Sequence, residues 1–306
     1  MILIGENIHV ISKKVREALQ NRDEIFVKNL INFQKKMDYV DLNVGPAKGD
    51  LAGVLAWVSG LVESENFSKI SLDTTNFFEM KNAILNLEKN EKVFLNSVGF
   101  DEEKLDLMTD LALENNSNLV ALTMSKNSGI PKSSDGRLEI AFQIYEKCLE
   151  NGMESESIYF DPLVLPLKVD QSQAVEALNT LKMIKESFDP PVRTIIGLSN
   201  ISNGVPVDLR PLINRVFGVM AFGAGLDAVI MDAGDEELIR VFRMLEKSSP
   251  EKDIDNLYLQ IAKMIENFEG LEAINYDDLD VEQVRVFKTC EVLLGEKIYS
   301  DSFAQV

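Results

Sequence analysis

The sequence predicts a (β/α)8 barrel, and three observations carry that prediction. Eight short runs of β-branched or apolar residues recur along the chain, and a longer stretch with helical spacing of its apolar positions follows each one. The runs start roughly 25 to 40 residues apart, the length of a strand, a crossover helix and two short loops. The 306 residues suffice for one large barrel. Eight such units in series favour a closed barrel over an open doubly wound sheet.

Each predicted strand ends in small or polar residues. The eight predicted strands are Ile2–Ile8, Tyr39–Val44, Lys69–Thr74, Val93–Val98, Asn118–Met124, Ile158–Val164, Arg193–Ser199 and Asp227–Asp232. The predicted helices are Lys14–Met37, Leu51–Glu65, Phe77–Lys89, Glu102–Asn115, Arg137–Glu150, Ser172–Ser187, Pro211–Ala224 and Glu236–Glu246. Gly152 and Asp189-Pro190-Pro191 stop two of these helices, and we expect Asp235 to cap the last one.

We expect a single domain over residues 1–306, with an acidic helical insertion at residues 246–282. In the insertion, Leu257–Phe268 has helical periodicity and Glu269–Asp280 is an acidic connection. The insertion holds 11 acidic and 3 basic residues, so it supplies −8 of the net charge of −19. A solvated helix face and loop is the simpler interpretation, and a docking surface for a partner is the alternative. Val281–Leu294 is expected to form the closing helix.

The composition disfavours several classes of function. With 50 acidic and 31 basic residues, the surface would repel phosphate backbones and anionic lipid headgroups, which argues against nucleic-acid and membrane roles. The start of the chain lacks a signal peptide and no later run is long enough for a membrane span, so we expect a cytoplasmic protein. Cys148 and Cys290 are predicted to be buried free thiols rather than disulfide or zinc ligands. The only histidine is His9, which excludes mechanisms that need two.

Polar residues end the predicted strands, where the chemistry of a βα barrel sits. Asp73, Asn96 and Asp161 are expected to point into one mouth and to read a flat heterocycle with an amidine-like edge, since a carboxylate accepts two adjacent N–H donors. For Asp41 and Asp232 a cap or loop brace is as plausible as a functional role. The rim lacks lysine, which argues against Schiff-base chemistry, and a divalent metal on its carboxylates is a minority alternative.

Seven ordered motifs make the sequence similar to a known family. They are Asp41-Leu42-Asn43-Val44-Gly45-Pro46, Leu72-Asp73-Thr74-Thr75-Asn76, Leu122-Thr123-Met124, Gly129-Ile130-Pro131-Lys132, Phe160-Asp161-Pro162-Leu163, Gly197-Leu198-Ser199-Asn200-Ile201-Ser202 and Arg210-Pro211-Leu212-Ile213-Asn214-Arg215. Together they resemble the methyltetrahydrofolate:corrinoid-protein methyltransferases, pterin-binding barrels related to dihydropteroate synthase and to the folate domain of methionine synthase. The resemblance covers residues 1 to about 245 and resumes near 285 to 303.

The resemblance implies roles for individual residues. Asp73, Asn96 and Asp161 would bind the pterin ring, Gly197 and Ser199 would line the pocket, and Asn203 and Arg210 would approach the rest of the folate. Asn200 would hydrogen-bond N5, the methyl-bearing nitrogen, so Asn200 and Asp161 are the expected catalytic residues. Two positions depart from the family pattern: Gly5-Glu6-Asn7 stands where Gly-Glu-Arg is frequent, and Asn203 replaces a frequent Gln.

The resemblance therefore implies transfer of a methyl group between N5 of tetrahydrofolate and the cobalt of a separate corrinoid protein, by a homodimer. N5 is a poor leaving group unless it gains a proton or a strong hydrogen bond in the transition state. An asparagine cannot be the acid, so the proton would come from water or a neighbouring carboxylate. The alternatives are a dihydropteroate synthase-like enzyme, for which Arg210 is the only expected rim cation, and a folate-binding protein without turnover.

Overall fold

The chain forms a closed barrel of eight parallel strands, as predicted. We analysed a computed structural model that describes residues 1–88 and 92–305. The strands are β1 (Ile2–His9), β2 (Tyr39–Asn43), β3 (Ile70–Asp73), β4 (Phe94–Phe100), β5 (Asn118–Ser125), β6 (Ile158–Asp161), β7 (Arg193–Gly197) and β8 (Ala228–Met231). Neighbours in sequence pair in parallel around the ring, and β1 closes it by pairing with β8. All eight predicted strands are confirmed, with ends that differ by at most a few residues.

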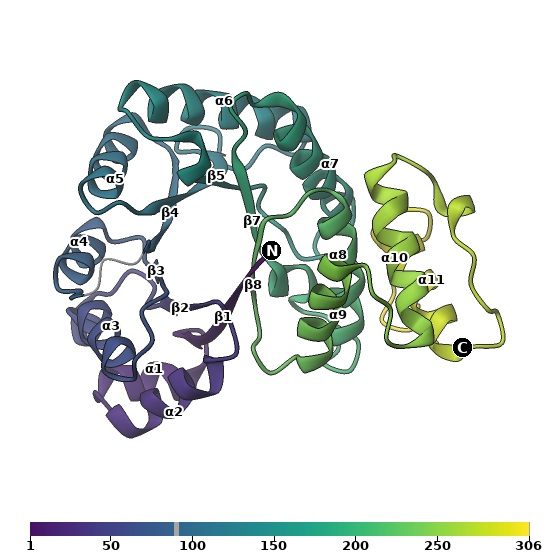
Figure 1. Cartoon of the computed structure of the whole chain (residues 1–306), viewed down its shortest axis with the longest axis horizontal. Helices are drawn as coiled ribbons and strands as arrows, with labels where there is room; N and C mark the ends of the chain where they lie inside the picture. The colour runs from purple at the N-terminus through teal and green to yellow at the C-terminus, as the bar shows by residue number, and fades with distance from the viewer. Residues whose placement is uncertain (89–91, 306) are drawn as a thin grey trace.

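Helices surround the barrel on the outside (Figure 1). They are α1 (Lys13–Gln20), α2 (Glu24–Gln34), α3 (Val54–Ser64), α4 (Phe77–Leu85), α5 (Glu102–Glu114), α6 (Ser134–Glu150), α7 (Ser172–Ser187), α8 (Arg210–Gly223) and α9 (Glu236–Lys247), followed by α10 (Asp253–Glu266) and α11 (Val281–Leu293). Asp235 caps α9 as predicted, because its side chain accepts a hydrogen bond of 2.9 Å from the backbone N–H of Leu238. The helix predicted over Phe77–Lys89 ends earlier, at Leu85, since residues 86–88 are not helical, and Lys89 itself lies outside the described residues.

Three other predicted helices also have different limits in the structure. The stretch predicted as one helix over Lys14–Met37 is two helices, because Arg22 takes a left-handed backbone angle and Asp23 starts α2 by accepting from Phe26 N. The stretch predicted from Leu51 breaks at Gly53, which also has a positive φ, so α3 starts at Val54. Helix α6 begins about one turn earlier than predicted, since Ser133 is its N-cap.

The inside of the barrel is filled by apolar side chains from alternate strand positions. Ile4, Phe94, Val120, Tyr159, Ile195 and Ala228 form one buried cluster. Phe94 makes edge-to-face contacts with Tyr39 and Tyr159 at ring-centroid distances of 4.9 and 4.8 Å. Because side chains alternate along a strand, the residues two positions further on also face inward, nearer the carboxyl ends of the strands. The strand positions that fill the core therefore determine which later residues on the same strands face the mouth of the barrel.

Helices α10 and α11 lie outside the ring of helices, beside α8 and α9 (Figure 1). Their apolar residues belong to the same buried cluster as α8, so the extension is part of the barrel domain's core. Gly223 at the end of α8 lies against the backbone of α10, since a Cβ there would be 2.2 Å from the carbonyl oxygen of Ala262. The predicted acidic insertion is therefore α10 with the acidic connection that follows it.

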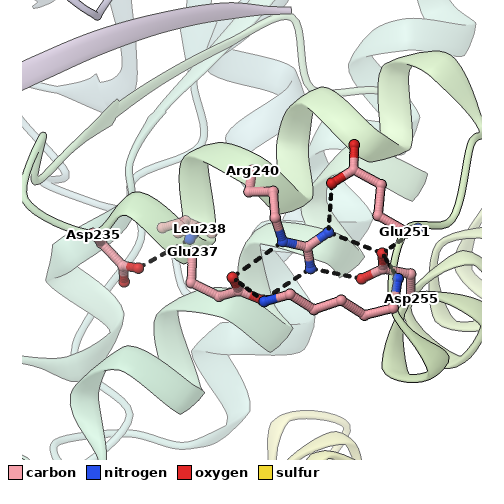
Figure 2. Close-up of polar contacts among 7 residues, drawn as sticks. Asp235, Glu237, Leu238, Arg240, Glu251 and Asp255 are labelled. Atoms are coloured by element: carbon pink, nitrogen blue, oxygen red, sulfur yellow. Dashed lines mark hydrogen bonds and ion pairs between the residues drawn. The ribbon is translucent and has the colours of Figure 1, made fainter.

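Arg240 on α9 ties the extension to the barrel (Figure 2). Its guanidinium donates 2.7 and 2.9 Å hydrogen bonds to the two carboxylate oxygens of Asp255, which is fully buried at the start of α10. It also donates to Glu237, whose carboxylate receives Lys252 Nζ at 2.7 Å. Backbone N–H groups of Glu251 and Lys252 complete the hydrogen bonding of Asp255, so this buried charge is fully paired.

Cys148 and Cys290 are buried free thiols, as predicted. Burial raises the pKa of the Cys148 thiol to about 12, so the thiol stays protonated at neutral pH. In the part of the chain that the structure describes, no helix is both long and apolar enough to span a membrane.

Candidate functional site

A polar layer lies directly above the apolar filling of the barrel. Glu6 follows Ile4 by two positions, Asp41 follows Tyr39, Asn96 follows Phe94 and Asp161 follows Tyr159. Strand pairing sets Asp73 beside Asn43 and Asn96, and sets Asp161 beside Leu122. The alternation of each strand therefore puts carboxylates and amides where the barrel opens.

On one side of this layer, the side chains of β2, β3 and β4 form a connected group. Asn43 donates a short hydrogen bond to Asp73. Ser71 donates to Asp41 at 2.6 Å, and Asn96 donates to the same oxygen at 3.4 Å. Burial raises the pKa of Asp41 to about 7, and burial together with the neighbouring Asp41 carboxylate raises the pKa of Asp73. A ligand that donates hydrogen bonds to these two carboxyl groups would favour their ionised forms.

Asp161 ends β6 on another side of the barrel. One carboxylate oxygen accepts a 2.7 Å hydrogen bond from the backbone N–H of Leu163, and burial raises the pKa of the carboxyl to about 7. The positive charge of Arg137 opposes that rise. A carboxylate with this surrounding can accept N–H donors from a ligand once it is ionised.

Arg137 is fully buried, at the start of α6. It donates to the Pro131 carbonyl at 3.0 Å and to Gln173 Oε1 at 2.5 Å, and its Nη1 has no hydrogen-bond partner. Gln173 in turn donates to the Lys132 carbonyl at 3.1 Å. Together these two side chains attach the loop between β5 and α6 to α7. Nothing in the helical pattern around Arg137 distinguishes it from a surface arginine, so sequence reasoning missed it.

A cavity of about 880 Å³ opens at the mouth beside β1, β7 and β8. Ser199, Asn200, Asn203 and Arg210 line it, all from the segment that follows β7. Asn203 donates to Asn200 Oδ1 at 3.3 Å, and Arg210 Nε donates to the Val205 carbonyl at 2.9 Å. Gly197 ends β7 below them, where a Cβ would come within 3.0 Å of Asn200 Nδ2. The small residue at position 197 therefore leaves room for the asparagine side chain.

The predicted site residues fall into two groups. Asp73, Asn96 and Asp161 are in the polar layer of the strands, and Ser199, Asn200, Asn203 and Arg210 line the cavity next to it. Gly197 lies between the groups, at the end of β7. Glu6 joins them, because it belongs to the polar layer, lines the cavity and receives a short hydrogen bond from Ser199. The alternation Ile2, Ile4, Glu6 could have singled it out.

The cavity has more cations than predicted. Arg210 was the only rim cation expected, but Lys14 from the start of α1 also lines the cavity. His9, at the end of β1, lines it too but is not a cation. The prediction considered strand ends alone, and Lys14 lies beyond one, in the first turn of the helix that follows. Burial lowers the pKa of His9, so its imidazole is neutral at neutral pH.

Asn7 and Asp232 brace the junction of β1 and β8. Asn7 Nδ2 donates to Asp232 at 2.6 Å, and Asn7 Oδ1 accepts from the backbone N–H of Ala233 at 3.0 Å. The same Asp232 oxygen accepts from Gly234 N at 2.7 Å. Asp232 thus acts as a loop brace while also lining the cavity. Within residues 1–88 and 92–305, no set of three or more His, Cys, Asp or Glu side chains is arranged to hold a metal ion.

Comparison with known proteins identifies the family. The profile described as "Pterin binding enzyme" matches residues 38–232, which contain seven of the eight strands and every polar residue predicted to bind the ligand. The chain belongs to the pterin-binding enzyme family.

This pterin-binding enzyme is similar to three kinds of characterised protein. A methylcorrinoid:tetrahydrofolate methyltransferase of Eubacterium limosum is 26% identical over 243 residues, which are 78% of this chain and 88% of that protein. The methionine synthase of Mycobacterium leprae is 27% identical over 253 residues, or 76% of this chain but only 20% of that protein. A dihydropteroate synthase of Anaplasma phagocytophilum, solved with 6-hydroxymethylpterin-monophosphate, shares the fold with a TM-score of 0.55 and 13% identity, covering 80% of this chain and 99% of that one.

Proposed function

We propose that this pterin-binding enzyme transfers a methyl group between N5 of tetrahydrofolate and the cobalt of a corrinoid carried by a separate protein. One observation carries the proposal: Glu6 and Gly197 connect the polar layer at the strand ends with the residues that line the cavity. The polar layer offers hydrogen-bond acceptors to the N–H edge of a pterin, and the adjoining cavity has the size to receive the rest of a folate. The relative in Eubacterium limosum, which this chain covers for 88% of its length, is named for the same reaction.

In this proposal Asp73, Asn96 and Asp161 hold the pterin, and Asn200 hydrogen-bonds N5. The side chain of Asn200 is exposed at the cavity, and the contact with Asn203 orients its amide. An amide both donates and accepts, so it can stay bonded to N5 as that atom changes charge during the transfer. Lys14 and Arg210 supply positive charge for the carboxylates of the glutamate tail. The corrinoid reaches the open mouth from its own protein, and the enzyme acts as a homodimer.

The decisive experiment mixes the protein with methyltetrahydrofolate and anaerobically reduced cob(I)alamin and follows the visible spectrum of methylcobalamin. We expect turnover by the wild type, and Asn200→Ala should lower the rate by about 100-fold to 1,000-fold, because a preorganised transition-state hydrogen bond is lost. The dissociation constant for methyltetrahydrofolate should change by only a few-fold. Equal losses of rate and affinity would indicate a binding protein.

Asn256→Ala is the matched control. Asn256 is exposed on α10, outside the barrel, so this variant should keep the wild-type rate. A wild type that fails to bind methyltetrahydrofolate would overturn the proposed function.

The second candidate, a dihydropteroate synthase-like reaction, is favoured by one observation. Lys14 and Arg210 give the cavity two cations that could hold a pyrophosphate. Four acidic residues line the same cavity, Glu6, Asp232, Asp235 and Glu236, and they oppose a polyanion. Incubation with 6-hydroxymethylpterin diphosphate and p-aminobenzoate tests it directly, and formation of dihydropteroate would replace the methyltransferase proposal.

A further inference from the structure

Methyl removal from N5 needs a proton, and the cavity contains a group placed to give one. We propose that Glu6 is the acid of the reaction and that its proton reaches N5 through the hydroxyl of Ser199. This inference rests on the proposed function. It identifies the source of the proton. Asn200 cannot be that source, because its amide has no acidic proton.

The contact between Glu6 and Ser199 links the polar layer to the N5 position. Glu6 ends the inward-facing row of β1, and Ser199 follows β7, so their short hydrogen bond crosses above β8. Both side chains line the cavity, and Ser199 is the direct neighbour of Asn200 in the chain. A hydroxyl can accept a proton on one side while it donates one on the other, which an amide N–H does not do.

The other carboxylates that line the cavity contact N–H groups or a lysine and not Ser199. Asp232 receives Asn7 Nδ2 and Gly234 N, and Asp235 receives the backbone N–H of Leu238 as the cap of α9. Glu236 is exposed and pairs with Lys36 at 3.1 Å. Burial raises the pKa of Asp235 as well, so it is geometry that distinguishes Glu6: Asp235 holds the start of α9, whereas Glu6 contacts Ser199 directly. The hydrogen-bond partner of Glu6 is a hydroxyl group, that of Ser199.

The surroundings of Glu6 favour its protonated form. Burial and the charge of Asp232 raise the pKa of Glu6, while the hydrogen bond from Ser199 acts in the opposite direction. Asp41 on β2 also interacts repulsively with Glu6. The cations of the same cavity, Lys14 and Arg210, lie in the segments after β1 and β7. Glu6 therefore holds its proton to higher pH than an exposed glutamate.

Methyl transfer forms one bond to cobalt, breaks one bond to N5 and moves one proton to N5. The methyl carbon bonds to Co(I), which supplies the electron pair, and the bond from that carbon to N5 breaks with its pair remaining on N5. When Glu6 is protonated, its carboxyl donates to the Ser199 hydroxyl, and the hydroxyl turns its own proton from Glu6 toward N5. The hydroxyl gives that proton to N5 while it takes the proton of Glu6, and the Glu6 carboxylate is reprotonated by solvent. In the opposite direction, the Glu6 carboxylate receives the proton that leaves N5 as the methyl group arrives.

The test measures single-turnover methyl transfer to cob(I)alamin for the wild type, Glu6→Gln and Ser199→Ala, over a range that begins near the ordinary pKa of a glutamate, from about pH 4.5 to about pH 9. The wild-type rate should fall as pH rises through the pKa of Glu6, because the protonated form is the donor. Glu6→Gln should be slower by about 100-fold or more and should lose this dependence, since a general acid contributes about that much. Ser199→Ala should be slowed in the same way, and both should bind methyltetrahydrofolate within a few-fold of wild type.

Glu6→Asp and Glu17→Gln complete the design. The aspartate variant keeps an acid and should retain part of the pH dependence, while Glu17, on the exposed face of α1, should be replaceable without effect. A Glu6→Gln variant that keeps the wild-type rate and pH profile would overturn the role of Glu6 and leave the proposed function standing. A wild type that binds methyltetrahydrofolate but transfers no methyl group would overturn both.

Discussion

Among single residues, the buried side chains that fill the barrel and the polar side chains at its mouth lie only two positions apart on the same strand. Ile4 is part of the buried filling of the barrel, and Glu6, two residues later, receives a hydrogen bond at the cavity. The same step separates Phe94 from Asn96 and Tyr159 from Asp161. The inward row of each strand continues to its polar residue, and the strand pairing of β1 and β4 becomes irregular directly after Gly5 and Asn96.

Binding of the pterin should depend on pH through Asp161. Its raised pKa of about 7 means that the carboxylate, the form that accepts two N–H donors, becomes dominant only above neutral pH. We expect the dissociation constant for methyltetrahydrofolate to fall about tenfold between pH 6 and pH 8, as the ionised fraction of a group with that pKa rises. Calorimetric titration at the two pH values measures it.

The variant Asp161→Asn distinguishes the contribution of this carboxyl to the pH dependence of binding from the contributions of Asp41 and Asp73. The variant should bind more weakly at pH 8 and lose most of the pH dependence, because its amide does not ionise. If the full dependence persists, Asp41 and Asp73 are responsible, since the pKa values of both are raised too.

The candidate site could be predicted from the sequence only in part. Asp73 and Asp161 end recognisable strands and Asn96 lies on the inward row of another, so their position toward the mouth follows from the barrel itself. Lys14 and Arg137 lie on helices, where their charge suits a solvated surface as well as a site. Their positions depend on how two neighbouring units pack, and the local pattern does not contain that information.

At the scale of elements, the limits of helices depend on single backbone angles. The apolar periodicity of residues 14–37 runs through a point where Arg22 takes a positive φ. A non-glycine residue adopts a positive φ only at a cost in conformational energy, and the side chain of an arginine gives no sign that it will do so. Strand limits were predicted more closely, because each barrel strand is bounded by polar residues at its mouth end.

Gln173→Ala should destabilise the junction of α6 and α7. The variant leaves the buried guanidinium of Arg137 without its 2.5 Å acceptor and the Lys132 carbonyl without its donor. We expect the free energy of unfolding to fall by about 3 kcal/mol, the magnitude for buried hydrogen bonds to a charged group. Denaturant unfolding measures the change, with the exposed Gln20→Ala as control. A change below about 0.5 kcal/mol would show that water replaces the lost contacts.

At the scale of the whole molecule, the helical extension belongs to the barrel rather than to a separate unit. The sequence indicated a helix there from periodicity and an acidic segment from charge. It gave no indication that Ala262 would meet Gly223 of α8, because that contact joins residues 39 positions apart in the chain. Packing between distant segments is where prediction from a single sequence is weakest.

Arg240→Met should therefore lower the stability of the whole chain. Removing the guanidinium leaves Asp255 fully buried without its cation, and we expect a loss of about 3–5 kcal/mol in the free energy of unfolding. Lys252→Ala breaks only the partly exposed pair with Glu237 and should cost less than about 1 kcal/mol. Equal effects of the two variants in denaturant unfolding would show that burial of Asp255 does not set the strength of this contact.

The position of His9 has a practical consequence. It is the only imidazole among 306 residues, and it lines the cavity. A proton NMR spectrum of the unmodified protein would carry one C2–H resonance in the imidazole region, from the mouth of the barrel. Without labels or substitutions, that signal would report when a ligand enters and how the local charge changes with pH.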